Sequence, residues 1–230
     1  MSNRKVIAVV GATGAQGGGL VRAILNDPNR TFAARVLTRD VNSAKAKGFA
    51  RLGAEVVTAD IDSSESLKRA FEGAYAAFCI TFFWAHFSPE KEMAEAKAMA
   101  IAAKATALRH VLWSTLEDTR QWVPLIDNRM PTLQGKYKVL HCDGKGESNH
   151  FFTDAGVPTT FLLTSLYWEN FNHFGMVRRM VRTESWSSHS RSAIRNFRGL
   201  PPRTSANVRT ASSRRVRNSS GRQSRFQART

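Results

Sequence analysis

Val6-Ile-Ala-Val-Val10, followed without a break by Gly11-Ala-Thr-Gly14-Ala-Gln-Gly17, is the stretch that decides the fold. The first five residues are apolar and largely β-branched, which is typical of a strand buried on both faces of a sheet. Beyond the glycines, apolar residues recur at helical spacing up to a proline: Leu20, Val21, Ile24, Leu25 and then Pro28. A strand, a glycine-rich turn and an amphipathic helix in this order predict the opening of a βαβ unit.

The same alternation continues to about Met176. We expect further strands at Ala33–Thr38, Glu55–Asp60, Ala76–Thr81, His110–Ser114 and Thr159–Thr164. Helices are expected after the capping-box-like Asp62-Ser-Ser-Glu65, from Ser88-Pro89 through the alanine-rich run to Leu108, and around Gly146–Ala155. Five or six strands in this rhythm predict an α/β fold with a doubly wound parallel sheet.

The glycine loop is also the first candidate functional site. Glycines between a buried strand and a helix allow a tight turn, and they let backbone N–H groups approach a pyrophosphate at the positive end of the helix. Glycines also occur in strand-to-helix turns that bind nothing, so the inference of a binding site depends on the buried strand before the loop and the amphipathic helix after it. The loop predicts a dinucleotide site, although its spacing is GxxGxxG and not GxGxxG.

The end of the second strand selects between cofactors. An acid there binds the ribose 2′-hydroxyl of NAD, whereas a cation binds the 2′-phosphate of NADP. The strand ends in Thr38-Arg39, which favours NADP, with Asp40 leaving NAD as the alternative. Asp60 is expected to contact adenine or to cap a helix. Thr81 and Phe82 are expected to line the crevice where the strand order reverses.

Residues 3–176 resemble the NmrA-like family, NADP-sensing relatives of the short-chain dehydrogenases that act as regulators. Beside the glycine loop and Thr38-Arg39, the resemblance rests on Trp113-Ser-Thr-Leu-Glu117, Asp143-Gly-Lys-Gly-Glu147 and Tyr167-Trp-Glu-Asn170. It implies a Rossmann fold that prefers NADP. We expect the dinucleotide to contact Gly11, Ala12, Thr13, Gly14, Ala15, Gln16, Gly17, Arg39, Asp60, Ile61, Thr81, Phe82, Lys145 and Tyr167.

A missing tyrosine argues against dehydrogenase chemistry. Short-chain dehydrogenases use a tyrosine whose phenol pKa is lowered by a lysine four residues later. Here that spacing gives His141 and Lys145, with glycines on both sides of the lysine that weaken the helix. Lys145 is therefore expected to contact the nicotinamide ribose, and His141 to be a packed or surface histidine. Neither Tyr137 nor Ser114 or Thr115 completes a catalytic set, so we assign no catalytic residue.

Two further groups of residues have structural interpretations. The aromatic cluster Phe82-Phe83-Trp84 with Phe87 predicts core or interface packing, with a lid or partner-binding patch as the alternative. Cys79 and Cys142 form no disulfide framework and show no zinc-type spacing, so we expect buried thiols and no metal site.

The start of the chain lacks a secretory pattern and no apolar run is long enough to span a membrane, which favours a reducing intracellular compartment.

The formal charge of +16 is concentrated in one segment. Residues 1–176 hold 20 Lys and Arg against 17 acids, whereas residues 177–230 hold 14 Arg, 11 Ser and one acid, Glu184. The second segment shows no helical or strand period, so burial could not offset its ordering entropy, and we expect disorder. The basic segment would bind polyanions without a recognition fold, so no specific nucleic acid is expected.

The arginine- and serine-rich composition of residues 177–230 is that of a coding sequence translated in a shifted frame. Restoring one base after the Met176 codon permits a continuation with balanced charge and a strand-like run, similar to the smaller second region that family members carry there. The prediction is a frameshift at this point, which the nucleotide sequence would test. Without the second region, the sheet and its crevice would expose apolar surface.

The leading hypothesis is an NADP(H)-binding regulatory or redox-sensing protein without dehydrogenase activity. The resemblance implies a protein partner such as a transcription factor, and hence a location in the cytoplasm or nucleus. The alternative is an NADPH-dependent reductase of the isoflavone-reductase type that uses Lys145 and His141. A third class, nucleic-acid binding, depends on the basic segment alone.

Overall fold

The computed structural model describes residues 4–165, Tyr167 and Asn170, all of which fall in one compact unit. The predictions for residues 177–230, and the boundary drawn at Met176, lie outside the described residues. So do Trp168 and Glu169 of the motif that begins at Tyr167. No helix in the described ranges is both long and apolar enough to cross a bilayer.

Within the described residues, six parallel strands form one sheet in the order β3-β2-β1-β4-β5-β6. Their bounds are β1 Lys5–Val9, β2 Phe32–Thr38, β3 Glu55–Thr58, β4 Ala76–Cys79, β5 His110–Thr115 and β6 Thr159–Leu163. The chain moves outward from β1 to β3 and then returns to pair β4 with the other side of β1. The strand order therefore reverses between β1 and β4, which is where a doubly wound sheet leaves a crevice at its carboxyl edge.

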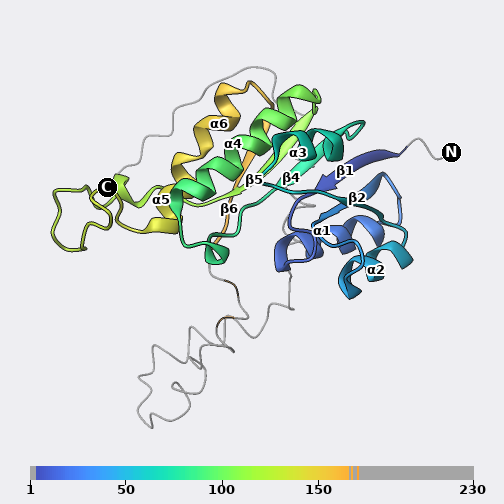
Figure 1. The fold of residues 1–230 in the computed structure, drawn as a ribbon, viewed down its shortest axis with the longest axis horizontal. Coiled ribbons are helices and arrows are strands. Elements are labelled where there is room, and N and C mark those ends of the chain that lie inside the picture. The colour runs from blue at the N-terminus through green and yellow to red at the C-terminus, as the bar shows by residue number, and fades with distance from the viewer. Residues whose placement is uncertain (1–3, 166, 168–169, 171–230) are drawn as a thin grey trace, which may run out of the picture. The chain divides into compact units, whose positions relative to one another are not determined.

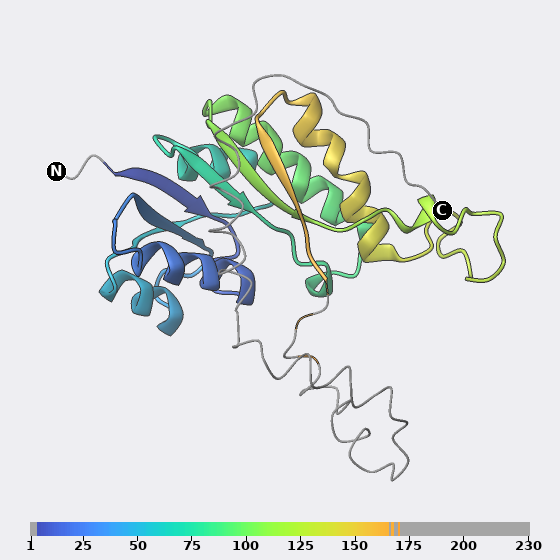
Figure 2. The ribbon, with the colours of Figure 1, turned by 180° about the vertical axis from the view of Figure 1, so that it is seen from behind.

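Helices cover both faces of the sheet (Figures 1 and 2). One face carries α1 Ala15–Leu25 and α2 Ala44–Arg51; the other carries α3 Ser64–Phe71, α4 Pro89–Ala105, α5 Leu140–Glu147 and α6 Asn149–Asp154. Two short 3-10 turns, η1 Phe83–Ala85 and η2 Thr119–Gln121, follow β4 and β5. This arrangement confirms the predicted doubly wound α/β fold.

Each face of the sheet has its own apolar core. Val21 of α1 and Phe49 of α2 pack with Val9 and Phe78 on one side. On the other side, side chains of α3, α4 and α6 cover the sheet; they include Leu67, Phe71, Met99, Ala103 and Phe152. The continuous apolar runs of the inner strands are explained by this burial on both faces.

The structure corrects three local predictions. The cap of α3 is Ser63, one residue later than the expected Asp62. The Ser63 hydroxyl accepts from the backbone N–H of Ser66, and the helix begins at Ser64. The expected helix around Gly146–Ala155 is two helices, of which α5 already begins at Leu140. Helix α2 was not predicted at all, although Ser43 caps it. The cap at Ser88 with Pro89 behind it is confirmed for α4.

Candidate functional site

The loop between β1 and α1 has the backbone geometry that the glycines predict. Gly11 has a φ of +64°, and a Cβ there would lie 2.8 Å from the Ile80 side chain. A Cβ on Gly17 would collide with the Gly11 carbonyl and lie 2.9 Å from the Cα of Ala12. Helix α1 can therefore approach the end of β1 this closely only because residue 17 has no side chain.

The amino end of α1 is free of side-chain caps. Gly14 occupies the N-cap position with no side-chain hydrogen bond, and the first turn contains no acid. Gly11, Gly14 and Ala15 are exposed at this point. The first N–H groups of a helix have no intrahelical acceptor, and the helix dipole favours an anion there. The exposed glycines and the free backbone N–H groups at the start of α1 thus fit the diphosphate of a dinucleotide.

Gln16 ties this loop to two other elements at the carboxyl edge of the sheet. Its side-chain oxygen accepts from the Ser114 hydroxyl of β5 at 2.7 Å, and its Nε2 donates to the Tyr167 hydroxyl at 2.7 Å. Gln16 is buried, with 6% exposure. The structure therefore brings together three residues that sequence analysis named separately.

The remaining residues predicted to contact a dinucleotide lie around the same edge. Arg39 is exposed after β2, and no hydrogen bond or ion pair of its guanidinium appears among the described residues. Asp60 is exposed after β3, where its carboxylate accepts from the backbone N–H of Asp62 at 3.1 Å. Ile61 is partly buried against the core. Phe82 follows β4 with 64% of its surface exposed.

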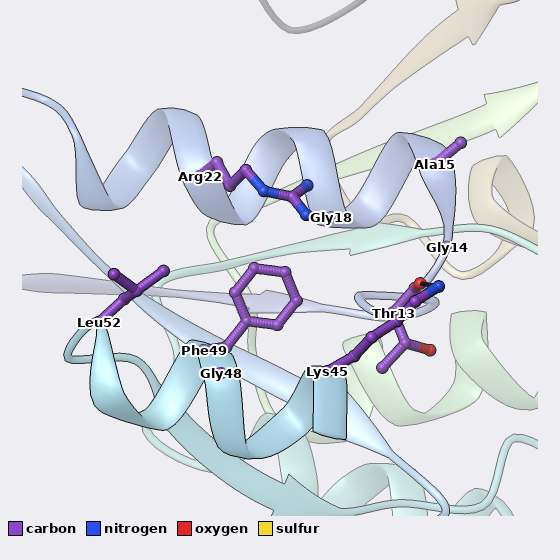
Figure 3. Close-up of a pocket in the computed structure, with 9 residues that line it drawn as sticks. All are labelled: Thr13, Gly14, Ala15, Gly18, Arg22, Lys45, Gly48, Phe49 and Leu52. Atoms are coloured by element: carbon purple, nitrogen blue, oxygen red, sulfur yellow. Dashed lines mark hydrogen bonds between the residues drawn. The ribbon is translucent and has the colours of Figure 1, made fainter. Parts of the chain in front are cut away.

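A pocket of about 460 Å³ lies between α1 and α2 beside the glycine loop (Figure 3). Lys45, in the first turn of α2, points toward the loop, and its Nζ donates to the Thr13 carbonyl at 3.0 Å. Phe49 and Arg22 face each other across the pocket, with the guanidinium 5.4 Å from the ring centre. Lys45 was not predicted as a site residue because α2 was not predicted. The available signal was the helix cap at Ser43.

Lys145 lies in a buried polar cluster with Thr81 and Glu92. Its Nζ donates to the Thr81 hydroxyl at 2.6 Å and to the Thr81 carbonyl at 3.2 Å, and it lies 3.2 Å from Oε1 of Glu92. The Thr81 hydroxyl in turn donates to the same Glu92 oxygen at 2.6 Å. Lys145 is therefore hydrogen-bonded to Thr81 and ion-paired with Glu92 in this cluster. Burial lowers the pKa of Lys145, and the Glu92 carboxylate opposes that shift.

Glu95 and His86 continue this cluster. Glu95 has 4% exposure, and the Nε2 of His86 lies 3.7 Å from its Oε1. Within the described part of the chain, Oε2 of Glu92, Oε2 of Glu95 and Nε2 of His86 have no hydrogen-bond partner. Burial is the main cause that raises the pKa of Glu95 to about 7. No sequence pattern singled out these residues.

The segment Asp143-Gly-Lys-Gly-Glu147 holds the connection between β5 and α5 in place. Asp143 is fully buried and accepts from the backbone N–H groups of Thr119 at 2.8 Å, Lys138 at 2.6 Å and Val139 at 3.0 Å. Glu147 lies 3.0 Å from the Arg120 guanidinium. This set of contacts fixes the turn of helix that carries Lys145.

The glycines of that segment do not weaken α5 as the sequence analysis supposed. A Cβ on Gly144 would lie 3.2 Å from the Pro89 ring, and one on Gly146 would lie 2.6 Å from the backbone nitrogen of Asp118. Both glycines therefore allow close packing inside a formed helix. Lys145 is held rigidly and not loosely.

His141 occupies the position where a dehydrogenase has its tyrosine, and it is packed against aromatic rings. Its ring centre lies 5.1 Å from that of Trp84 and 5.7 Å from that of Phe83. Burial lowers the pKa of His141, so the neutral imidazole is favoured at neutral pH. Tyr137 is buried and donates to the Glu90 carboxylate at 3.0 Å, away from Lys145.

The aromatic cluster after β4 is divided between core and surface. Phe83 is buried, whereas Phe82, Trp84 and Phe87 expose 64%, 55% and 61% of their surface. Burial in the core therefore explains Phe83 alone. Cys79 is buried, and Cys142 is partly buried with its thiol pKa raised by burial to about 11, so neither thiolate is favoured at neutral pH.

The fold and this loop define a Rossmann-type α/β protein with a nucleotide-binding geometry at the β1–α1 turn. The chain belongs to the NmrA-like family, whose model matches residues 3–192.

Curated relatives in this family are named as oxidoreductases. The chain is 32% identical over 160 residues to the NmrA-like family domain-containing oxidoreductase notA of Aspergillus sp. (strain MF297-2), a match that covers 67% of this chain and 43% of notA. It is 39% identical over 124 residues to notA′ of Aspergillus versicolor, covering 51% and 34%. The chain thus spans less than half the length of these relatives.

Solved structures share the fold. The crystal structure of NmrA, a negative transcriptional regulator, in complex with NADP superposes with a TM-score of 0.57 at 24% identity, covering 70% of this chain and 45% of NmrA. The Citrobacter sp. triphenylmethane reductase complexed with NADP(H) gives a TM-score of 0.60 at 22% identity, covering 75% and 54%. At this level of identity the likeness establishes the fold.

Proposed function

We propose that this chain binds NADP(H) and acts as a nucleotide-sensing regulator. The observation that carries the proposal is the uncapped amino end of α1, which Gly17 allows to lie against the end of β1. Such a loop offers backbone donors to a diphosphate and leaves no side chain in the way. The bound nicotinamide would supply hydride chemistry, whereas the residues of this chain bind and orient the coenzyme.

Charge around the loop favours the phosphorylated coenzyme. Arg39 follows β2 and Lys45 reaches the loop from α2, so two cations flank the place where the adenosine ribose would lie. Asp40 is exposed, and its Oδ1 accepts from the backbone N–H of Asn42 at 2.8 Å in the turn before α2. The two cations are suited to a 2′-phosphate, and Asp40 leaves NAD as the alternative.

The regulatory role rests on the chemistry around Lys145. His141 stands at the tyrosine position with a lowered pKa and packs against aromatic rings. Lys145 is already hydrogen-bonded to Thr81 and paired with Glu92. Binding without turnover is the simplest use of such a site. A protein partner such as a transcription factor, and a place in the cytoplasm or nucleus, belong to the same proposal.

Calorimetric titration of the chain with NADP and with NAD tests the coenzyme assignment. We expect NADP to bind at least about tenfold more tightly, and Arg39→Ala and Lys45→Ala each to reduce that preference. Arg51→Ala is the matched control, since it removes an exposed guanidinium from α2 away from the loop. Absence of heat and of any melting shift with both coenzymes would contradict the proposal.

A reductase is the second candidate, favoured by the buried Lys145 at the carboxyl edge and supported by relatives that are named oxidoreductases. The discriminating experiment incubates the chain with NADPH and a panel of small carbonyl compounds while following NADPH absorbance. The regulatory proposal predicts no turnover above the rate without protein. Turnover that Lys145→Ala abolishes, with NADPH affinity retained, would replace the regulator by the reductase.

A further inference from the structure

A second hollow lies on the helical layer formed by α3, α4 and α6. These helices run side by side on one face of the sheet, with α4 in the middle (Figures 1 and 2). The groove between them encloses about 680 Å³ and is lined by residues of all three helices. None of its lining residues takes part in the nucleotide loop, so its role is separate from coenzyme binding.

The floor of this groove is apolar. Ala100 and Ala105 of α4 and Phe151 of α6 line it, together with Ile101, which is 43% exposed. The opposite side of α4 packs into the core through Ala96, Met99 and Ala103. Ile101 leaves an exposed apolar side chain on the outer side of the helix, between the charged residues of the same helix.

Lysines form the rim of the groove. Lys97 and Lys104 lie four residues before and three residues after Ile101, which places all three along one stripe of α4. Lys68 of α3 joins them and pairs with Glu65 at 2.5 Å. Within the described residues, Lys97 and Lys104 form no ion pair. The lining contains one acid, Asp154, so the rim is positively charged overall.

This charge disfavours two occupants that the chain itself could provide. A second copy docked through the same face by two-fold symmetry would bring these lysines against their own counterparts. The segment of residues 177–230 carries 14 Arg and one acid, so the lysine rim would repel it. The groove therefore suits a different molecule, one that presents carboxylates beside an apolar stripe.

We propose that the groove docks an acidic amphipathic helix of a partner protein. Its apolar stripe would cover Ile101 and Phe151, and its carboxylates would meet Lys97 and Lys104. Helices bind to grooves in this way through apolar anchors at helical spacing, with flanking charges fixing their register. A 17-residue helix such as α4 offers a wall long enough for several turns of a docked helix.

A fluorescent synthetic peptide tests the proposal on the full chain by anisotropy. The probe has about 14 residues, roughly four turns, with leucines at helical spacing among glutamates and alanines. A second peptide has the same composition with the leucine positions scrambled. Since both peptides carry the same charge, the scrambled one measures any attraction by the arginine-rich segment. We expect the patterned peptide to bind at least about tenfold more tightly.

Two variants assign that difference to the groove. Lys97→Glu and Ile101→Ser should each remove most of the preference for the patterned peptide, while NADP affinity and melting temperature stay unchanged. Lys47→Glu is the matched control, because it reverses an exposed lysine on α2, on the other face of the sheet. This control should retain the full preference.

Three outcomes would overturn the proposal. The first is equal affinity for the two peptides, and the second is a preference that survives Lys97→Glu and Ile101→Ser. The third is binding to vesicles containing phosphatidylserine, or to a single-stranded RNA, that Ile101→Ser abolishes while peptide binding is unaffected. That result would assign the groove to a membrane surface or a nucleic acid.

Discussion

At the scale of single residues, the buried polar cluster behind the crevice decides how the site behaves. Lys145 is hydrogen-bonded to the Thr81 hydroxyl and carbonyl and is paired with Glu92. The carbonyl contact at 3.2 Å is the longer of the two hydrogen bonds. The cluster therefore keeps the lysine oriented in the absence of coenzyme.

Glu95 makes the stability of the protein depend on pH. Burial raises the pKa of Glu95 from 4.5 to about 7, with further contributions from Asp62, which raises it, and Lys91, which lowers it. Between these two pH values the folded state binds more protons than the unfolded state. The free energy of unfolding should therefore fall as pH rises from 4.5 to 7 and level off above 7.

Glu95→Gln should remove this fall in the free energy of unfolding above pH 4.5. A shift of this size corresponds to about 2 kcal/mol once partial screening is allowed for, so the variant should be more stable than the parent by about that amount at pH 8. Near pH 4.5 the two proteins should be equal. Urea unfolding between pH 4.5 and pH 8 measures the free energy of unfolding of both proteins. The control is Glu72→Gln, at an exposed position. A stability difference that does not vary with pH would contradict the assignment.

At the scale of elements, the approach of α1 to β1 sets the shape of the nucleotide loop. A methyl group on Gly17 would overlap the Gly11 carbonyl, which is backbone and cannot move aside cheaply. Gly48, in α2, has nothing within 4 Å of its hypothetical Cβ. The packing therefore requires a glycine at position 17 in α1 but not at position 48 in α2.

This contrast gives a paired prediction. Gly17→Ala should displace α1, reduce NADP affinity at least about tenfold and lower stability by about 1–3 kcal/mol. Gly48→Ala should leave affinity unchanged and raise stability by up to about 1 kcal/mol, because alanine favours a helix interior. Calorimetric titration and urea unfolding of both variants test the pair. Equal effects of the two substitutions would show that the close approach does not matter.

At the scale of the whole molecule, charge separates the chain into two parts. Residues 1–176 carry a net of +3, and residues 177–230 carry a net of +13. Attraction of a polyanion to such a segment arises from counterion release and needs no fold. Nucleic-acid binding by this chain is therefore expected to be a property of residues 177–230, independent of the Rossmann sheet.

Deletion of residues 177–230 tests that separation. The shortened chain should keep its NADP affinity within about twofold and lose its affinity for heparin, whereas the full chain should bind heparin with a steep dependence on salt. Filter binding at several salt concentrations, beside calorimetry with NADP, gives both quantities. Affinity for a nucleic acid that does not change with salt would contradict this account and favour a specific recognition site.

Much of the fold follows from local sequence. The apolar run ending at Val10, the glycines behind it and the cap at Ser88 each act within a few residues, so their outcome could be predicted without tertiary contacts. Local reasoning failed at α5, where glycines indicated a weak helix. There the decisive partners, Pro89 and Asp118, are distant in sequence, and their close approach gives the glycines a packing role.

The sequence by itself determined the doubly wound sheet, the position of the loop at its carboxyl edge and the family to which the chain belongs. Only the tertiary structure decided that Glu92 holds Lys145, that Lys45 reaches Thr13, and that a lysine-rimmed groove crosses α4. The reason is physical. A strand or a turn is specified by neighbours along the chain, whereas a buried ion pair or a groove forms between side chains that only folding brings within a few ångströms.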